Sequence, residues 1–312
     1  MSLAFIFPGQ GSQYVGMGKA LAEAYAAART TLDEADRVLG RPLTRILFEG
    51  PEEELRITWN TQPAILAVSV ACLRVLETTV KVAPAAYAGH SLGEYTALVA
   101  AGAMSFGDAL RTVEKRGRLM QEAVPLGTGT MAAVLGLDAE PVAKICADVS
   151  RPGAVVELAN DNCPGQVVIS GHAAAVEEAG KRAREAGAKR TKPLPVSAPF
   201  HCSLMVPAGQ KLAVVLRSVA FSPARAPVVA NVDAIPNRDA ARTPDLLVRQ
   251  VSSPVLWQDC VKKLASLGVD TFVEVGPGKV LTGLVRRILP SAAVANVEDP
   301  ASVESLAAGA RA

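Results

Sequence analysis

The feature that most constrains the fold is the pentapeptide Gly89-His90-Ser91-Leu92-Gly93, which favours a sharp turn between two kinds of element. It fits G-x-S-x-G, a pattern in which a serine occupies a strained turn between a strand and a helix. The glycines relieve crowding where a side chain would collide with the neighbouring strand or helix. Residues 85–88 form a short apolar run, and residues 92–101 have the pattern of a helix. The motif therefore predicts a strand–turn–helix unit with the Ser91 hydroxyl exposed near the positive end of a helix.

Composition bounds the remaining possibilities. The same pentapeptide arises by chance in glycine-rich chains, and this chain has 25 glycines among 312 residues. Half of the residues are hydrophobic and 20% are charged, so a sizeable core can be buried. The net charge of +2 gives no reason to expect nucleic-acid binding. The longest apolar run, residues 64–73, is well short of the ~18 residues that a membrane span needs. We expect a cytoplasmic protein that binds neither nucleic acid nor membrane.

The cysteines and histidines do not indicate a metal site. The five cysteines are scattered and contain no C-x-x-C pair, and only three histidines accompany them. Free thiols in a reducing compartment are the simple interpretation.

Strand and helix patterns alternate along most of the chain. Residues 18–39 have a helical pattern, residues 61–76 predict a buried helix, Ser105 is a candidate N-cap for a helix over 106–123, and residues 139–149 predict another helix. This alternation favours a mainly parallel sheet covered by helices. The middle of the chain differs, because residues 127–195 have the order βαββαβ, which is typical of the ferredoxin-like pattern. We therefore expect an α/β protein with a large α/β-hydrolase-like domain and an inserted small ferredoxin-like subdomain. Residues 1–126 and 196–312 would form the large domain, and residues 127–195 the insert.

A serine nucleophile needs a base, and His201 is the best placed of the three histidines. His90 adjoins Ser91, where the turn should direct its ring away, and His172 lies at the start of a predicted helix. His201 follows the insert, so serine precedes histidine as in α/β-hydrolase-type enzymes. A lone histidine is more often structural, but this one is the candidate general base.

Several blocks along the chain together resemble the malonyl-CoA:acyl-carrier-protein transacylases and the related acyltransferase domains of polyketide synthases. Each block is weak alone, but the resemblance spans nearly the whole chain. The blocks are Phe7-Pro8-Gly9-Gln10-Gly11-Ser12-Gln13, Gly89 to Glu94, Lys115 to Gln121, Gly127 to Val134, Pro199-Phe200-His201, Arg249 to Val255 and Glu274 to Gly278.

The resemblance implies roles for five residues. Ser91 would attack the malonyl thioester, and His201 would take the serine proton. The main-chain carbonyl of Gln250 would orient the histidine, in place of the usual carboxylate. The main-chain N–H groups of Gln10 and Leu92 would hold the oxyanion.

The resemblance also implies two specificity residues. Arg116 would bind the malonyl carboxylate through two parallel hydrogen bonds. The alternative is a solvated helix arginine, because Arg111 and Arg118 lie on the same predicted helix and most such arginines are exposed. Phe200 would leave little room beside the acyl α-carbon and so disfavour methylmalonyl groups.

The insert carries further candidates for binding. Asn160, Asn162 and Gln166 match a polar stretch that lines the family's cleft and would contact the pantetheine arm or acyl group, although turn chemistry explains Asn-Asp-Asn-Cys-Pro-Gly equally well. A group of basic residues could dock an acidic carrier protein or CoA phosphates, and a solvated helix face is the alternative. Those of the insert are Lys181, Arg182, Arg184, Lys189, Arg190 and Lys192, and a second small cluster outside it consists of Arg286 and Arg287.

The implied activity is transfer of malonyl from malonyl-CoA to the phosphopantetheine thiol of acyl carrier protein, through an ester on Ser91. No metal or cofactor is expected beyond these two thioester substrates, and we expect a monomer. Other functions stay open: a trans-acting polyketide acyltransferase, an acyl hydrolase on the same scaffold, and a non-catalytic scaffold that binds carrier protein. Arg116 argues against a hydrolase for uncharged acyl chains, and the intact pair of Ser91 and His201 argues against a scaffold.

Overall fold

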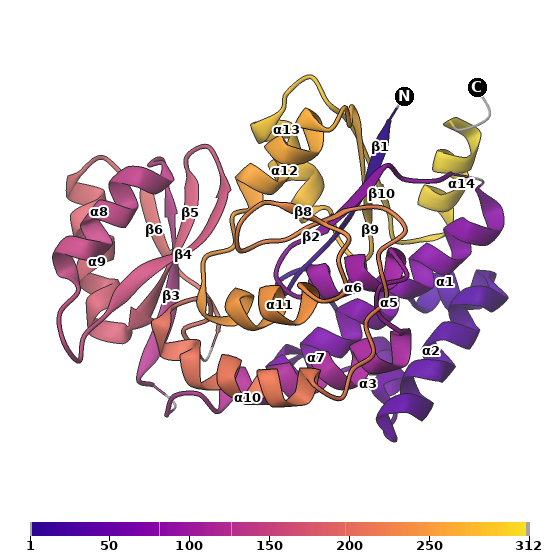
Figure 1. The fold of residues 1–312 in the computed structure, drawn as a ribbon, viewed down its shortest axis with the longest axis horizontal. Helices are drawn as coiled ribbons and strands as arrows, with labels where there is room; N and C mark the ends of the chain where they lie inside the picture. The colour runs from indigo at the N-terminus through magenta and orange to yellow at the C-terminus, as the bar shows by residue number, and fades with distance from the viewer. Residues whose placement is uncertain (1, 81, 126, 197, 310–312) are drawn as a thin grey trace.

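The chain forms two β-sheets with helices packed around them (Figure 1). The computed structural model describes residues 2–80, 82–125, 127–196 and 198–309. The six-stranded sheet has the order β10-β9-β1-β2-β7-β8, and the four-stranded sheet has the order β4-β5-β3-β6. This mixed α/β architecture, with one mainly parallel sheet and one separate smaller sheet, confirms the predicted fold class.

The larger sheet is parallel except at one edge, where β7 and β8 pair antiparallel. Its central strands are buried apolar runs, as expected of a sheet covered on both faces. Phe7 pairs with Gly89, so the first strand and the strand before the G-x-S-x-G motif end at the same carboxyl edge. The strands are β1 (Leu3–Phe7), β2 (Ala86–Gly89), β7 (Val228–Val229), β8 (Pro236–Asn237), β9 (Thr271–Val275) and β10 (Ala293–Val297).

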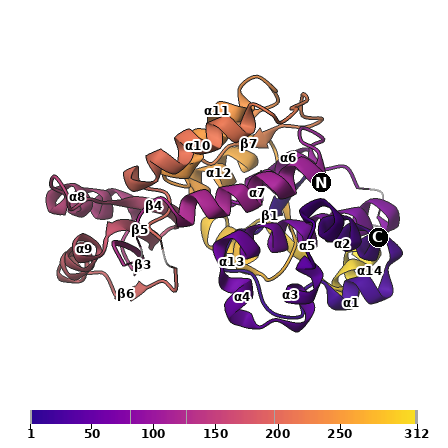
Figure 2. The same ribbon diagram turned by 90° about the horizontal axis from the view of Figure 1, so that it is seen from below.

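Helices from both halves of the chain cover this sheet. Most of α5 is buried, including its apolar stretch, which confirms the fully buried helix predicted there. Figure 2 shows α10 alongside α7, although residues 122–205 separate them in the chain. The helices are α1 (Lys19–Ala24), α2 (Ala26–Leu39), α3 (Leu43–Glu49), α4 (Glu52–Arg56), α5 (Thr58–Thr79), α6 (Gly93–Ala100), α7 (Phe106–Gln121), the 3₁₀ turn η1 (Ser203–Met205), α10 (Val206–Leu216), α11 (Thr243–Ser252), α12 (Trp257–Ser266), α13 (Val280–Ile288) and α14 (Pro300–Gly309).

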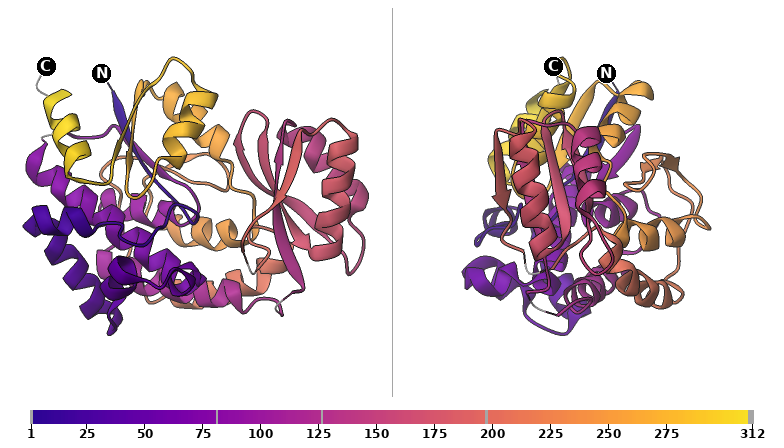
Figure 3. Two further views of the ribbon diagram at one scale, coloured as in Figure 1. Left: turned by 180° about the vertical axis from the view of Figure 1, so that it is seen from behind. Right: turned by 90° about the vertical axis from the view of Figure 1, so that its left-hand side faces the viewer.

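The smaller sheet is antiparallel throughout, and the order of its elements is the predicted βαββαβ. Its two helices cover the face that is turned away from the larger sheet (Figure 3). We propose that residues 127–195 are an inserted subdomain and that residues 1–126 and 196–312 form the catalytic domain. The elements are β3 (Gly129–Leu135), α8 (Ala139–Val149), β4 (Val156–Cys163), β5 (Gln166–His172), α9 (Ala173–Glu185) and β6 (Arg190–Pro193).

Strand β4 joins the smaller sheet to the rest of the chain. The main-chain N–H of Asp161 donates to the carbonyl of Val255, and the N–H of Val255 donates to the carbonyl of Ala159. This bridge brings one edge of the smaller sheet against the loop before α12. A contact between Asn162 of β4 and His90, which follows β2, places β4 beside the end of β2. Within the described residues, no helix combines the length and the apolar content needed to cross a membrane.

Some elements differ from the predictions. The helical pattern over residues 18–39 is divided at Tyr25, where the main chain is extended between α1 and α2. Strand β10 was not predicted, because it is an edge strand in which only Val297 is fully buried. The turn interpretation of Asn160 and Asn162 is wrong, since both residues lie within β4, at two irregularities of its pairing with β5.

Candidate active site

The G-x-S-x-G motif forms the predicted strand–turn–helix unit. Ser91 follows β2 directly, and its main chain adopts a left-handed conformation with φ of 50°. A Cβ atom at Gly89 would overlap the main chain of Gly93, and one at Gly93 would overlap the carbonyl of Phe7. Both glycines are therefore required by the close crossing of β1, β2 and α6, and the strained turn presents the serine hydroxyl.

The serine hydroxyl lies within hydrogen-bond distance of an imidazole. The Oγ of Ser91 is 2.8 Å from Nε2 of His201, and both side chains are buried. The Nδ1 of His201 is 2.9 Å from the main-chain oxygen of Gln250, which can only accept. Nδ1 therefore carries the proton, and Nε2 of the neutral ring is free to accept the serine proton.

His201 is held in its neutral form. Burial, and to a lesser extent the nearby charge of Arg116, lowers its pKa to about 3. Like Ser91, His201 has a left-handed main chain, with φ of 60°. Strained backbone at two residues in contact is typical of a site whose geometry the surrounding fold fixes.

Two main-chain amides lie beside the serine. Gln10 follows β1 and Leu92 precedes α6, and both line the same cavity as Ser91. In the part of the chain that the structure describes, no acceptor bonds to either N–H. The turn after β1 approaches closely because Gly9 has no Cβ, which would overlap the carbonyl oxygen of His90. Two free N–H groups beside a hydroxyl can stabilise an oxyanion.

Arg116 is buried in the site, so the solvated alternative is wrong. It comes from α7 and is 1% exposed, whereas on that helix Arg111 is exposed and Arg118 is half-buried, and both lie near acidic side chains. Its Nη2 donates to Ser91 Oγ at 3.1 Å and to Gln250 Oε1 at 2.9 Å. Its Nη1 donates to Gln62 Oε1 at 2.9 Å. All these acceptors are neutral.

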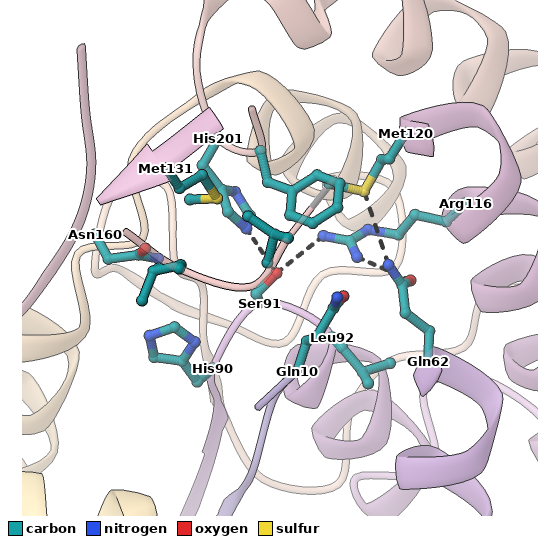
Figure 4. A pocket seen from close by; sticks show the side chains of 13 residues that line it. Gln10, Gln62, His90, Ser91, Leu92, Arg116, Met120, Met131, Asn160 and His201 are labelled. Atoms are coloured by element: carbon teal, nitrogen blue, oxygen red, sulfur yellow. Dashed lines mark hydrogen bonds between the residues drawn. The ribbon is translucent and has the colours of Figure 1, made fainter. Parts of the chain in front are cut away.

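The serine, the histidine and the arginine enclose one small cavity of about 100 Å³ (Figure 4). Phe200 is buried and lines it beside His201. Several lining residues were not predicted, because single apolar or amide side chains in a sequence give no sign that they face a cavity. These are Gln62, Met120, Met131, Leu194 and Val196.

A second cavity of about 220 Å³ adjoins the first, and it contains the polar candidates from the insert. Asn160 lines both cavities, whereas Asn162 and Gln166 line only the second. His90 is turned away from the serine, as predicted, and its Nε2 is 2.9 Å from Oδ1 of Asn162. Figure 4 shows its ring apart from the pair of Ser91 and His201. The Oε1 of Gln166 accepts a hydrogen bond from Arg287.

Two buried residues outside the predicted set support the serine turn. The side chain of Asn231 accepts from the main-chain N–H of Ser91 at 2.6 Å and donates to the carbonyl of Gly89 at 2.7 Å. The carboxyl of Glu94 accepts from the main-chain N–H of Asn231 at 2.9 Å and from Nε2 of Gln250 at 2.8 Å. Glu94 is part of the G-x-S-x-G-E block, whereas Asn231 lies 140 residues from Ser91 and has no local signal.

The arrangement defines a class of chemistry. Ser91, His201 and the amides of Gln10 and Leu92 line one cavity, where they can act as a nucleophile, a base and an oxyanion site, the parts that acyl transfer requires. Across the described ranges, no three His, Cys, Asp or Glu residues are grouped so that they could hold a metal ion.

Comparison with known proteins identifies the family. Residues 4–310 match the model of the acyl transferase domain. The chain is 52% identical over 302 residues to the malonyl CoA-acyl carrier protein transacylase of Salmonella typhimurium and 50% identical to that of Bacillus subtilis, covering at least 95% of each protein. This protein belongs to the family of malonyl CoA-acyl carrier protein transacylases.

Solved structures agree with this assignment. An acyl carrier protein S-malonyltransferase from Vibrio cholerae superposes with a TM-score of 0.95 at 50% identity, with 98% of this chain and 100% of that one covered. The malonyl-transacylase of a type II polyketide synthase, solved in complex with its acyl carrier protein, gives 0.97 at 48% identity, with 99% and 100% covered.

Proposed function

We propose that this protein transfers malonyl from malonyl-CoA to the phosphopantetheine thiol of an acyl carrier protein, in the cytoplasm and as a monomer. The acceptor is a carrier protein of fatty acid or polyketide synthesis, and one similar structure is a malonyl-transacylase in complex with the acyl carrier protein of a type II polyketide synthase. No cofactor takes part beyond the two thioester substrates.

The observation that carries this proposal is the environment of Arg116. A buried cation is costly unless an anion accompanies it. Among the described residues, no carboxylate lies within ion-pair distance of this guanidinium, and its Nε has no hydrogen-bond partner. The group shares its cavity with the serine hydroxyl, so an acyl chain that ends in a carboxylate would supply the missing anion at the point where Ser91 attacks the thioester.

The first half-reaction loads the enzyme. Ser91 Oγ attacks the thioester carbonyl carbon while His201 Nε2 takes its proton. The oxygen of the tetrahedral intermediate is stabilised by the N–H groups of Gln10 and Leu92. The carbon–sulfur bond then breaks, the CoA sulfur leaves with the proton from His201, and malonyl remains as an ester on Ser91.

The second half-reaction reverses these steps with a different thiol. His201 takes the proton of the phosphopantetheine thiol, the sulfur attacks the ester, and Ser91 Oγ recovers the proton as it leaves. The main-chain carbonyl of Gln250 keeps the imidazole oriented throughout. A neutral orienting group suits this exchange, because a thiolate is a good leaving group and needs less assistance than an amine.

The two cavities would bind different parts of the substrate. We propose that Phe200 limits the space beside the acyl α-carbon in the smaller cavity. We propose that Asn160, Asn162 and Gln166 contact the pantetheine arm along the larger one.

The test is incubation with malonyl-CoA, acetyl-CoA or methylmalonyl-CoA, with and without holo carrier protein, followed by intact mass measurement. We expect a malonyl ester on the wild-type enzyme that is absent from Ser91→Ala and is discharged by carrier protein. We expect little acetyl or methylmalonyl ester. A malonyl ester that is released to water as fast as to carrier protein would instead identify a hydrolase. If no ester formed on the wild-type enzyme, the non-catalytic scaffold would be the better interpretation.

A further inference from the structure

The buried carboxyl of Glu94 lies behind the site and bonds to none of the reacting groups directly. It occupies the first turn of α6 and is 3% exposed. Its Oε2 accepts from the main-chain N–H of Asn231 and from Nε2 of Gln250. No ion pair within 4.0 Å joins it to Arg116 in the described part of the chain. The connection between the two residues is the side-chain amide of Gln250.

The hydrogen bonds around Gln250 define which end of its amide faces which neighbour. Nε2 donates to the carbonyl of Ser91 at 3.0 Å and to the carboxyl of Glu94 at 2.8 Å. Oε1 accepts from Nη2 of Arg116 at 2.9 Å. A flipped amide would place an oxygen against two oxygens and an N–H against a guanidinium N–H, so only one orientation satisfies every group.

We propose that Glu94 is a positioning residue for malonyl selection, which holds the Gln250 amide so that its oxygen faces and aligns Arg116. This inference rests on the proposed function, because it concerns the residue that would bind the malonyl carboxylate. The main-chain carbonyl of Gln250, which orients His201, does not depend on this amide. A defect at Glu94 should therefore affect malonyl, which uses Arg116, more than acetyl, which has no carboxylate.

The role depends on the reach of the acceptor oxygen more than on its charge. Burial raises the pKa of Glu94 to about 7, so its charge is easily lost near neutral pH. A carboxyl keeps an acceptor oxygen in both protonation states. Two substitutions separate these two properties. Glu94→Gln keeps the length of the side chain and an acceptor oxygen but removes the charge. Glu94→Asp keeps the charge, but its side chain is shorter by one methylene.

The experiment measures kcat and KM for ester formation from malonyl-CoA and from acetyl-CoA. We expect Glu94→Asp to lower the malonyl-to-acetyl ratio of kcat/KM by about tenfold, mainly through KM for malonyl-CoA, which is the effect of one hydrogen bond to a charged group. We expect Glu94→Gln to stay within about threefold of the wild type by the same measure. The proposal would be overturned if the malonyl-to-acetyl ratio of kcat/KM in Glu94→Asp equalled that of the wild type. It would also be overturned if Glu94→Gln lowered this ratio as much as Glu94→Asp does.

Matched controls separate positioning from a general loss of stability. Glu274 is another buried glutamate, whose carboxyl bonds to the start of α13. We expect Glu274→Asp to lower the melting temperature without changing the ratio. In a Gln250→Met background, Glu94→Asp should change the ratio no further, because the link is already missing.

Two outcomes remain distinguishable. If Glu94→Asp does not fold, Gln250→Met alone decides, since an unchanged ratio in that variant overturns the proposal. If the proposed function itself is wrong, the wild-type enzyme forms no malonyl ester, whereas failure of this inference leaves the wild type active and selective.

Discussion

At the scale of single residues, Arg116 distinguishes this site from that of a general serine hydrolase. Its guanidinium is held by neutral oxygens and loses most of its hydration, so the folded protein carries an electrostatic cost that an anionic substrate would offset. Burial also lowers its pKa, although an arginine remains charged at neutral pH.

We expect Arg116→Ala to reduce malonyl ester formation by at least about a hundredfold, the cost of losing a paired ionic contact of roughly 3 kcal/mol. Acetyl transfer should survive or rise, because the substitution also removes a charge that lowers the pKa of His201. Ester formation from both donors would be followed by intact mass. Arg111→Ala, an exposed arginine on the same helix, is the control and should behave as wild type. Equal losses for malonyl and acetyl would contradict this role.

The lowered pKa of His201 has a consequence for pH dependence. For an ordinary histidine with a pKa of about 6.5, the neutral fraction of the imidazole would fall about tenfold between pH 7 and 5.5. Because the folded pKa of His201 is about 3, its ring stays neutral across that range. We expect single-turnover ester formation to change by less than about twofold over the same interval, and a fall with a midpoint near pH 6.5 would be inconsistent with this environment.

The sign for stability is the opposite of the usual one for a histidine that gains a partner. The folded state resists protonation of His201, so the unfolded state binds more protons between the two pKa values. The free energy of unfolding is therefore not reduced by His201 above about pH 6.5, and it falls as the pH is lowered from there toward 3.

Part of the site follows from residue patterns, and part does not. The contact between Ser91 and His201 is the one expected from their order in the chain, and the carbonyl of Gln250 lies where the family resemblance implied. The roles of Glu94 and Asn231 were not predicted, because their contact joins segments 137 residues apart and depends on the parallel pairing of β2 with β7. Sequence periodicity contains no information about such pairs.

At the scale of elements, the turn between β2 and α6 is the least tolerant part of the fold. The main chains of Gly89 and Gly93 approach too closely for any side chain, and main-chain atoms cannot be moved aside as a flexible side chain can. The α6 helix therefore starts directly against β1, which places Leu92 beside the serine.

We expect Gly89→Ala to lower the free energy of unfolding by roughly 3 kcal/mol or more, in the range of severe core overpacking. Gly283→Ala is the matched control, because that glycine lies in α13 with an ordinary helical backbone, and a Cβ added there would meet no neighbouring atom within 4 Å. It should be neutral or stabilising by up to about 1 kcal/mol. Urea unfolding of both variants would show the difference, and equal effects would contradict the argument.

Element prediction succeeded where the patterns were local. Helix α8 has the predicted bounds, Ala139–Val149, and Ser105 caps α7 by accepting from the N–H of Asp108, as its position suggested. Strand β10 was missed because its alternation is weak at the edge of the sheet. The division of the first helical region at Tyr25 was missed because no proline or glycine marks it.

At the scale of the whole molecule, the site lies where the two sheets meet. The larger sheet supplies Ser91 and Gln10 at its carboxyl edge, and β4 of the smaller sheet brings Asn160 and Asn162 to the adjoining cavity. The basic residues considered for docking, those of the insert and Arg287 of α13, divide into two groups. Arg182 pairs with Glu178 and Arg287 bonds to Gln166 and Pro164, whereas Lys189 and Arg190 remain exposed.

We expect the double charge reversal Lys189→Glu with Arg190→Glu to raise KM for carrier protein several-fold at low salt, and the difference to shrink as ionic strength rises. Arg37→Glu with Arg45→Glu is the control, on α2 and α3, which Figure 1 shows at the opposite end of the molecule from the smaller sheet. A KM that stays constant across salt concentrations would exclude docking at Lys189 and Arg190.

The partner of the imidazole has a consequence for how this enzyme can vary. In most serine enzymes the group behind the histidine is a carboxylate that one codon change removes. Here it belongs to the peptide backbone at the end of α11, which every amino acid provides equally. Replacing Gln250 by each of the other amino acids would therefore keep the main-chain carbonyl that accepts from His201. The contribution of this hydrogen bond could be measured only by displacing the end of α11 or by chemically replacing the peptide bond.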